Sequence, residues 1–289
     1  MAEGKVYEQG WRLDDVSWER FDASKVQSWL LTSIKASALV EYNAPDYVTY
    51  LRRIFQDAGP ETLAAIETWG QEESQHGRAL ARWASFADPS FDLEETFARF
   101  RKGYRPTHFE AADTVSVRGS RRGEMVSRCV VESGTSTFYT AIKEANDEPV
   151  LKEIAGRIAA DEFRHYKLFY ETLHKQDEPK LTFWKMLRLA AGRITESDDD
   201  EIAYAYYCVC VPASQEAAIP YVRERYARMA VVGTMRLYRR RHIDKLVQMV
   251  AKAIGAKPRG LFARTAGAVM WRILTVRASL SRVTAGSAA

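Results

Sequence analysis

The segment IAADEFRHYKLFY, residues 158–170, places three ionisable side chains among apolar residues that are spaced as on a buried helix face. At 3.6 residues per turn, Glu162 and His165 project from the same face, and Asp161 lies beside them in the sequence. A lone Glu-x-x-His is more often part of a solvated helix face than a binding site. The interpretation of this segment therefore depends on whether the chain repeats the pattern.

A second copy occurs in QEESQHGRAL, where Glu73 stands three residues before His76. Two further glutamates lie in apolar surroundings: Glu41 in SALVEYN and Glu132 in CVVESGT. Glu41 precedes Glu73 by 32 residues, and Glu132 precedes Glu162 by 30. The matching spacings predict two helical hairpins with the same chemistry, related by a pseudo-twofold axis.

Four ionised carboxylates inside a helical core would repel one another and lose their hydration unless cations neutralised them. Two divalent ions supply that charge. The same ligand set, one Glu from each of two helices and a Glu-x-x-His from each of two others, holds pairs of iron or manganese ions in helical bundles. Oxygen and imidazole ligands without thiolate suit either metal. The sequence predicts a dimetal centre, with a metal-free bundle as the alternative, on Glu41, Glu73, His76, Glu132, Glu162 and His165.

Apolar spacings of three and four residues predict a chain that is helical almost throughout. Pro60 and Pro149 lie where helix starts are expected, and about 35 residues between the second and third helices permit a crossover. The core helices are expected at residues 23–57, 60–86, 122–146 and 149–175. We therefore expect an all-α fold, with a four-helix bundle around the dimetal centre in residues 1–180. Additional helices and a basic C-terminal region, packed on the bundle or appended to it, are expected in residues 181–289.

The composition is that of a folded protein. Of the 289 residues, 46% are hydrophobic, which is enough for a core, and the 28% of charged residues argue against wholesale disorder. The start, MAEGKVYEQGW, lacks the features of a signal peptide, and no run approaches the roughly 18 apolar residues of a membrane span. We expect a cytoplasmic protein. Its cysteines, Cys129, Cys208 and Cys210, form no C-x-x-C pair and are interpreted as core residues.

Charge is unevenly distributed along the chain. Residues 221–289 contain 15 Lys and Arg against two acids, a net charge of +13, which leaves −9 for residues 1–220 because the whole chain carries +4. The basic tail is either a solvated surface or a docking surface for an acidic partner: a carrier protein, anionic lipid at the inner membrane surface, or nucleic acid. Its last apolar stretch, LFARTAGAVMWRILTVRASL, is a weak candidate for a membrane helix, because its arginines do not share one stripe.

Over about residues 24–175 the motifs resemble those of the soluble acyl-carrier-protein desaturases, a ferritin-like di-iron family. The likeness lies in EYNAPDYVTYL, WGQEESQHG, ESGT and IAADEFRH, and thus extends beyond bare ligand spacing. It implies a ferritin-like fold in which the six predicted ligands bind iron. The chain is shorter than the usual plant desaturase, and no family motif follows residue 185, so the resemblance does not cover the C-terminal region.

The resemblance also assigns supporting roles. Asp161 matches the carboxylate that supports the histidine of the other half, and by pseudo-symmetry Glu72 does the same for His165, because a metal-bound imidazole needs an acceptor on its other nitrogen. Thr135 matches a hydroxyl thought to deliver protons, although a threonine bonded to a helix carbonyl is the alternative. Trp69 is either on an electron route or in the core. The residues that would line an acyl channel, or would equally be ordinary core residues, are Met125, Cys129, Ser136 and Tyr139.

The function implied is that of an oxygen-activating oxidoreductase that uses two iron ions, with manganese as the alternative metal, to oxidise a fatty acyl chain. Desaturation is the expected reaction, with hydroxylation or another oxidation as variants. A ferredoxin-like electron donor, an acyl carrier protein or acyl lipid as substrate, and a homodimer are further expectations of the resemblance. Two alternatives stay open: a di-iron hydroxylase for a non-acyl substrate, such as an aromatic acid, an aldehyde or a tRNA nucleoside, and an iron-handling protein of the ferritin or rubrerythrin kind. No tyrosine is marked as a radical site.

Overall fold

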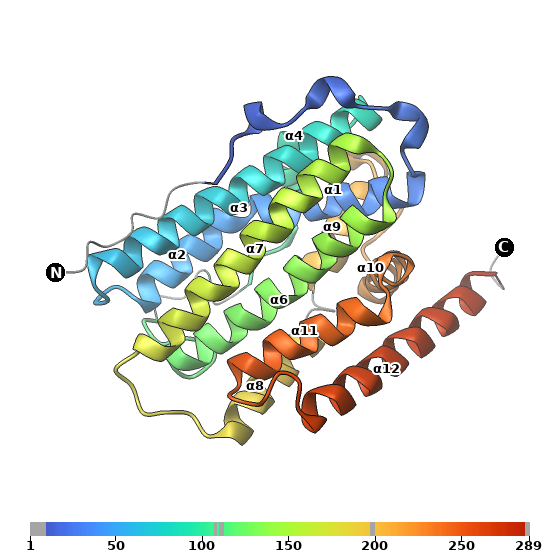
Figure 1. Ribbon diagram of the computed structural model, residues 1–289. Coiled ribbons are helices and arrows are strands. Elements are labelled where there is room, and N and C mark those ends of the chain that lie inside the picture. The colour runs from blue at the N-terminus through green and yellow to red at the C-terminus, as the bar shows by residue number, and fades with distance from the viewer. Residues whose placement is uncertain (1–9, 107–108, 110–112, 197–199, 287–289) are drawn as a thin grey trace.

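The computed structural model describes residues 10–106, 109, 113–196 and 200–286, and within these residues the chain is all-α, without a strand (Figure 1). Residues 1–9 lie outside the described residues. They make up most of the N-terminal segment for which the sequence predicts no signal peptide. In the described part, no helix combines the length and the apolar character that a bilayer crossing requires. This finding concerns helices that cross a bilayer, so the weak candidate for a membrane helix at residues 261–280 stays a prediction as a helix on a membrane surface.

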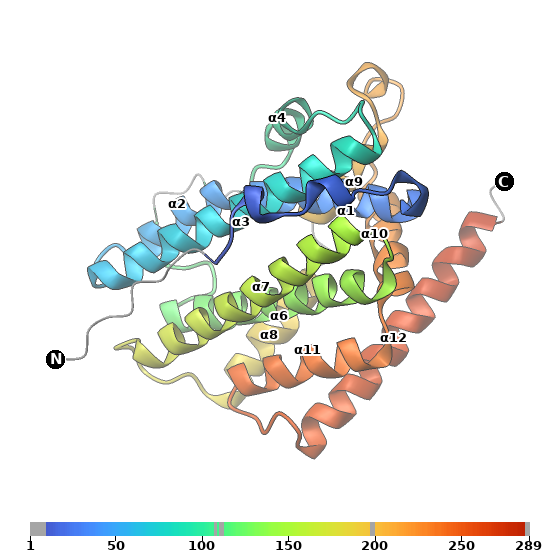
Figure 2. The ribbon, with the colours of Figure 1, turned by 45° about the horizontal axis from the view of Figure 1, so that its top comes forward.

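Four long helices form the centre of the molecule: α1 (Ser28–Tyr42), α3 (Pro60–Ala87), α6 (Arg121–Ala145) and α7 (Pro149–Lys175). They pack as two pairs, α1 along α3 and α6 along α7, and α3 faces α7 (Figures 1 and 2). The helices predicted at 60–86, 122–146 and 149–175 agree with α3, α6 and α7 to within one residue at each end. The two predicted hairpins are thus confirmed as neighbouring pairs of helices.

The helix predicted at residues 23–57 is wrong in two respects. Residues Ala23–Lys25 form a 3₁₀ turn, and α1 begins only at Ser28. The chain then breaks at Asn43 before α2 (Ala44–Ile54). Pro45 accounts for the break, since proline lacks the amide hydrogen of a helix interior but fits the first turn of a new helix.

The start of α7 is fixed by a buried carboxylate. Glu148 caps the helix by accepting hydrogen bonds from the backbone amides of Val150 and Leu151. The same carboxylate accepts a hydrogen bond of 2.6 Å from the indole of Trp83 on α3. Pro149 follows as the first helical residue, and the bond to Trp83 joins this end of α7 to α3, the helix that carries the other Glu-x-x-His motif.

The predicted crossover contains α4 (Leu93–Gly103), and further helices follow the central four: α8 (Phe183–Glu196), α9 (Asp200–Cys210), α10 (Arg223–Leu237), α11 (Arg240–Ala253) and α12 (Leu261–Gly286). Of these, α9 packs on α1, α8 and α11 pack on α6, and α12 lies at the outside against α10 and α11 (Figure 2). The additional C-terminal helices are thus confirmed, whereas the boundary at residue 180 stays a prediction. Cys129 and Cys208 are buried as predicted, but Cys210, at the end of α9, is exposed.

Candidate metal centre

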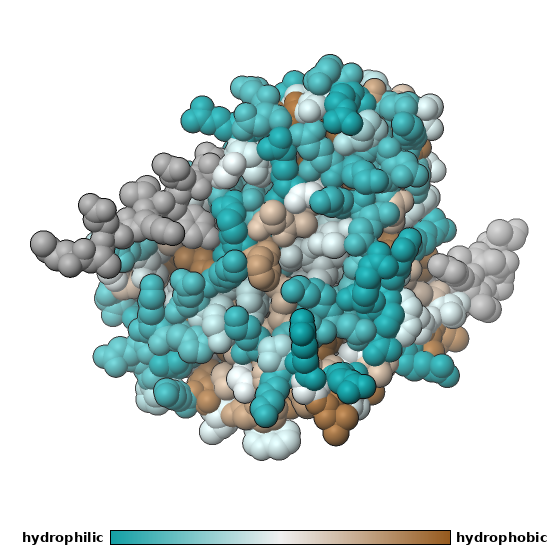
Figure 3. Space-filling model, in the orientation of Figure 1, coloured by the Kyte–Doolittle hydropathy of each residue, from teal (hydrophilic) through white to brown (hydrophobic). Residues whose placement is uncertain are grey.

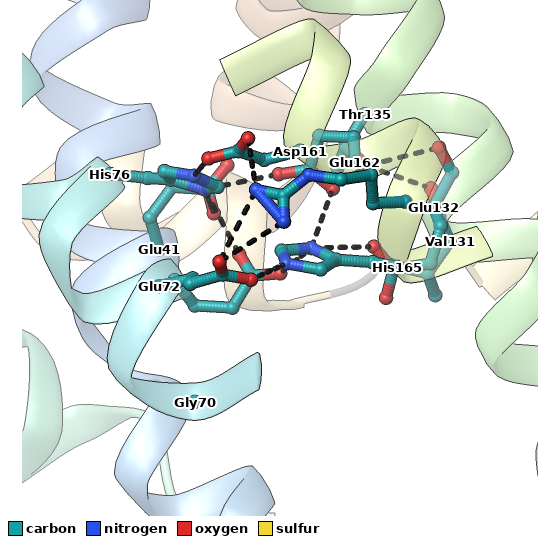
Figure 4. A network of polar contacts seen from close by, with 12 residues as sticks. Glu41, Gly70, Glu72, His76, Val131, Glu132, Thr135, Asp161, Glu162 and His165 are labelled. Carbon is teal, nitrogen blue, oxygen red and sulfur yellow. Dashed lines mark hydrogen bonds and ion pairs between the residues drawn. The ribbon is translucent and has the colours of Figure 1, made fainter. Parts of the chain in front are cut away.

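The six predicted ligands converge between the two helix pairs, where they form two groups of four residues. Figure 4 shows Glu41, His76, Glu132, Glu162 and His165 of this set. In each group, one ligand atom per residue can be chosen so that all four atoms lie within 4.8 Å of one another. The His76 group contains Glu41, Glu73, His76 and Glu162, and the His165 group contains Glu73, Glu132, Glu162 and His165. Glu73 and Glu162 belong to both groups, as carboxylates that bridge two cations would.

Burial makes this convergence energetically demanding. The imidazoles of His76 and His165 are fully buried, and none of the four glutamates exposes more than 7% of its surface. Carboxylates so far from water need positive charge or protons beside them, because the loss of hydration otherwise costs several kcal/mol per ion. Helical geometry imposes the placement, since each Glu-x-x-His presents both of its side chains to the same interior.

Each imidazole is held through its outer nitrogen. Nε2 of His76 lies 3.0 Å from Oδ2 of Asp161, and Nε2 of His165 lies 2.7 Å from Oε2 of Glu72. The two carboxylates predicted to support the imidazoles therefore contact them as expected. With Nε2–H donating outward, the lone pair on Nδ1 of each ring points into the ligand group.

The inner atoms lack the partners that buried polar atoms normally have. Nδ1 of His76 and of His165, and Oε1 of Glu132 and of Glu162, make no hydrogen bond within the described part of the chain. Nδ1 of His76 is 3.2 Å from Glu162, and Nδ1 of His165 is 3.0 Å from Glu73, so these atoms surround shared positions without bonding one another. This donor set of buried oxygen and imidazole atoms fits divalent cations such as iron or manganese.

Protonation in the metal-free protein follows from the same crowding. Burial, reinforced by neighbouring carboxylates, raises the pKa of Glu41 and Glu132 well above the ordinary value. Burial lowers the pKa of each histidine, but the surrounding carboxylates outweigh it, so the pKa of His76 and His165 is raised well above the ordinary value. Without cations, the centre therefore retains protons that metal binding must displace.

An arginine and a tryptophan join the outer carboxylates. Arg164 donates to Glu72 at 3.2 Å and also to Asp161, and thereby links the supports of the two histidines. Trp11, in the segment before α1, donates from its indole to Asp161 at 2.7 Å and stacks on His76 with the ring centroids 6.1 Å apart. Sequence reasoning missed both residues. Arg164 could have been found as the residue one turn after Asp161, whereas no local signal marks Trp11.

Two hydroxyl groups contact the ligands. Tyr139 donates to Glu41 at 2.5 Å, and burial beside that carboxylate raises the pKa of the phenol, which keeps it protonated. Thr135 donates to Oε2 of Glu162 at 2.6 Å and also lies 3.3 Å from two carbonyl oxygens of its own helix. The bond to the helix backbone, which was the alternative in the sequence, is therefore present together with a contact to a predicted ligand, and proton delivery by Thr135 stays a prediction.

The other residues considered in the sequence lie in the core. Trp69 is buried edge-on against Phe169, with ring centroids 5.5 Å apart. Met125 and Cys129 are buried among apolar side chains, and Ser136 donates to the backbone of α7. Met125 also borders a narrow apolar cavity between α3 and α7. The centre of a water molecule could occupy about 10 Å³ of it. In this conformation the cavity has room for about one water molecule.

No family model matches this chain, and no curated protein matches it either.

Proposed function

We propose that the protein is a di-iron oxidoreductase that activates dioxygen and oxidises a fatty acyl chain, with desaturation as the reaction. The observation that carries the proposal is the pair of ligand groups that share Glu73 and Glu162. Two shared carboxylates, one further carboxylate for each group and one imidazole for each group make up a dimetal ligand set. On this proposal, the central helices form a ferritin-like bundle around the metal pair.

The acyl substrate is supported by the residues around the ligands. The resemblance to acyl-carrier-protein desaturases lies in the segments that contain Glu41, Trp69, Thr135 and Glu162. The structure brings Thr135 into hydrogen-bond contact with Glu162, so one of the non-ligand residues of these motifs touches the ligand set. A ferredoxin-like donor and a carrier protein are the partners that such an enzyme would use.

Dioxygen is the oxidant: with two electrons from the donor and a bound iron pair to activate it, it would remove two hydrogens from unactivated C–H bonds of the acyl chain and leave as water. The chain's own residues prepare the site. Asp161 and Glu72 orient the imidazoles, and Arg164 fixes both carboxylates. Thr135 holds a proton 2.6 Å from Glu162 at the less buried side of the site, where a proton could be exchanged with solvent. The buried apolar residues around the ligands exclude water.

The proposal is tested by mass spectrometry of a mixed pool of acyl carrier proteins after incubation with iron-loaded, reduced protein and dioxygen. We expect one acyl species to lose two hydrogens. His165→Ala should abolish the change, because it removes a ligand of one group. A matched control is His242→Ala, which removes a buried histidine outside both groups and should leave the reaction intact.

The other outcomes distinguish the alternatives. A gain of one oxygen would retain the acyl substrate but make the reaction a hydroxylation. Consumption of dioxygen without any acyl change would overturn the acyl assignment and favour a non-acyl substrate. Uptake of iron far beyond two ions per chain would instead indicate iron handling. Full activity of His165→Ala would contradict the metal-site assignment itself.

A further inference from the structure

The last helix, α12, has two apolar faces, and only one of them is covered. On the covered face, Ala263, Met270 and Leu274 pack against the apolar side of α11. The two helices approach closely at Gly267, where a Cβ atom would lie 2.6 Å from Oδ1 of Asp244. This face accounts for the attachment of α12 to the rest of the molecule.

The second face is exposed. Val269, Ile273, Val276 and Leu280 follow one another at intervals of four, three and four residues, which places them in one stripe along the helix. Each of them exposes between 47% and 63% of its surface. Phe262, seven residues before Val269, is 41% exposed and extends the stripe toward the start of the helix.

An exposed tryptophan adjoins this stripe. Trp184, at the start of α8, exposes 75% of its surface. Its ring lies 5.3 Å from that of Phe183, which in turn lies 5.8 Å from that of Phe262. In Figure 3, apolar surface accordingly gathers at the lower edge of the molecule, over α8 and the start of α12. Exposed apolar residues that gather in this way are typical of an interaction site.

The charged residues of α12 itself are all arginines. At 100° per residue, Arg272 and Arg277 lie on opposite flanks of the stripe. Residues 245–289 contain eight Lys and Arg and no Asp or Glu. An apolar stripe flanked by arginines, with tryptophan at its end, is the pattern of a helix that lies in the interface of an anionic membrane.

A second copy of the chain would be a less favourable partner for the exposed stripe than an anionic membrane. The spacing would also fit a coiled coil, but in a parallel pair of α12 helices Arg272 and Arg277 would occupy the g and e positions. Arg272 of each copy would then face Arg277 of the other. These like charges would repel, with no acidic residue in 245–289 to neutralise them.

We propose that the exposed stripe of α12, together with Trp184, docks the protein on a membrane surface rich in anionic lipid, with the helix lying in the plane of the interface. The apolar side chains enter the region between headgroups and acyl chains, and the arginines contact lipid phosphates. This inference uses none of the metal ligands, so it stands or falls separately from the proposed enzymatic function.

The test is flotation of the full-length, metal-loaded protein with vesicles of phosphatidylcholine alone or mixed with phosphatidylglycerol. We expect binding only to the mixed vesicles, and weaker binding at 0.5 M salt because the phosphate contacts are screened. Ile273→Gln combined with Val276→Gln should reduce binding about tenfold or more. The matched control, Val115→Gln with Val117→Gln, alters two exposed valines on the segment before α6 and should bind like the wild type.

The charges are tested in the same assay. Arg272→Gln should weaken binding about fivefold, as expected for one basic residue at an anionic surface. Arg264→Gln removes the same charge from another side of α12 and should have a smaller effect. The proposal would be overturned if the two arginine variants weakened vesicle binding equally and the apolar double variant did not weaken it. Binding would then be a nonspecific electrostatic attraction between the basic protein and the anionic lipid.

Two further results would overturn it. The first is absence of binding to anionic vesicles. The second is a lipid-free dimer that the Ile273→Gln and Val276→Gln double variant dissociates, since the stripe would then be covered by a second copy. Circular dichroism of each variant shows whether the helices persist, so that loss of binding is not mistaken for loss of folding.

Discussion

In the His76 group, the carboxylate that is not shared, Glu41, accepts a hydrogen bond of 2.5 Å from Tyr139, whereas its counterpart in the His165 group, Glu132, has a buried oxygen without a hydrogen-bond partner. The support of His76 is also held more firmly, because Trp11 and Arg164 both donate to Asp161. The two groups therefore match in their ligands but differ in their surroundings. The two groups could each hold one cation, and Glu132 has fewer hydrogen-bond partners than Glu41 to keep it in place.

The largest expected effect is on the number of metal ions bound, and it distinguishes the shared carboxylates from the unshared ones. Glu162→Gln should abolish tight binding at both positions, whereas Glu132→Gln should leave about one of two metal ions bound. The reason is that Glu162 contributes an atom to both groups, while Glu132 contributes to one. Metal analysis after equilibrium dialysis against Mn²⁺ measures the difference. Glu124→Gln, at a buried glutamate of α6 outside both groups, is the matched control and should retain both ions. One ion retained by Glu162→Gln would show that this residue does not bridge.

The next largest effect is the dependence on pH. In the metal-free protein the pKa of Glu41, Glu132, His76 and His165 is raised, so the folded state binds more protons than the unfolded state. Their contribution to stability is complete below the unfolded values, 4.5 for the carboxyl groups and 6.5 for the imidazoles, and is lost as pH rises through the folded values. Metal binding displaces these protons, which makes the affinity increase with pH by about tenfold per unit for each proton released.

Thermal unfolding of metal-loaded and metal-free protein measures the direction in which stability and metal affinity change with pH. The difference between the two melting temperatures should widen as pH rises from 5 toward 8, because the free form loses stability while the loaded form gains affinity. Burial raises the pKa of Glu73 and Glu162, but the adjacent histidines, together with Glu41 in the case of Glu73, outweigh it and lower both values. These two carboxyl groups therefore act in the opposite direction, but mainly below pH 4.5. A difference that narrows with rising pH would contradict the protonation described above.

A smaller effect comes from the outer carboxylates. Asp161→Asn should weaken metal binding in the His76 group about 10- to 100-fold, and Glu72→Gln should do the same in the His165 group. Each replacement removes the charge that holds one imidazole by Nε2. Titration with Mn²⁺, followed by paramagnetic resonance, should show one weakened position in each variant. If either variant weakened both positions equally, Arg164 would be coupling the two supports more tightly than their separate contacts suggest.

The sequence predicts the buried cluster of Glu and His side chains well because the determinants of the cluster are local. A Glu-x-x-His motif fixes both side chains on one helix face, and Pro60 and Pro149 define where two of the four helices begin. The contacts that distinguish the two groups are not local. Trp11 meets Asp161 across 150 residues, and Tyr139 meets Glu41 across 98, so neither contact leaves a periodic signal. The same holds for the stripe of α12, since periodicity shows an apolar face but not whether another helix covers it.

Tyr139→Phe tests the asymmetry at the unshared carboxylates. The replacement leaves Glu41 without its hydrogen-bond donor and should lower the free energy of unfolding of the metal-free protein by about 1–3 kcal/mol. A bound cation would compensate in part, so the loss should be smaller in the metal-loaded form. Urea unfolding of both forms measures it. Tyr166→Phe, which removes a buried hydroxyl bonded to the carbonyl of Met249, should cost the same in both forms.

The smallest effect distinguishes the two tryptophans near the centre. Trp11→Phe removes the indole donor to Asp161 while retaining an aromatic ring against His76, and should weaken metal binding in the His76 group about fivefold, since one hydrogen bond contributes about 1 kcal/mol. Trp69→Phe should not change the affinity, because Trp69 contacts Phe169 rather than a supporting carboxylate.

The turnover rates of the same two variants test the route by which electrons reach the site. If Trp69→Phe slowed turnover at unchanged metal affinity, electrons would reach the centre through Trp69. Slower turnover in Trp11→Phe alone, beyond what its affinity explains, would place that route at the better-supported His76 group.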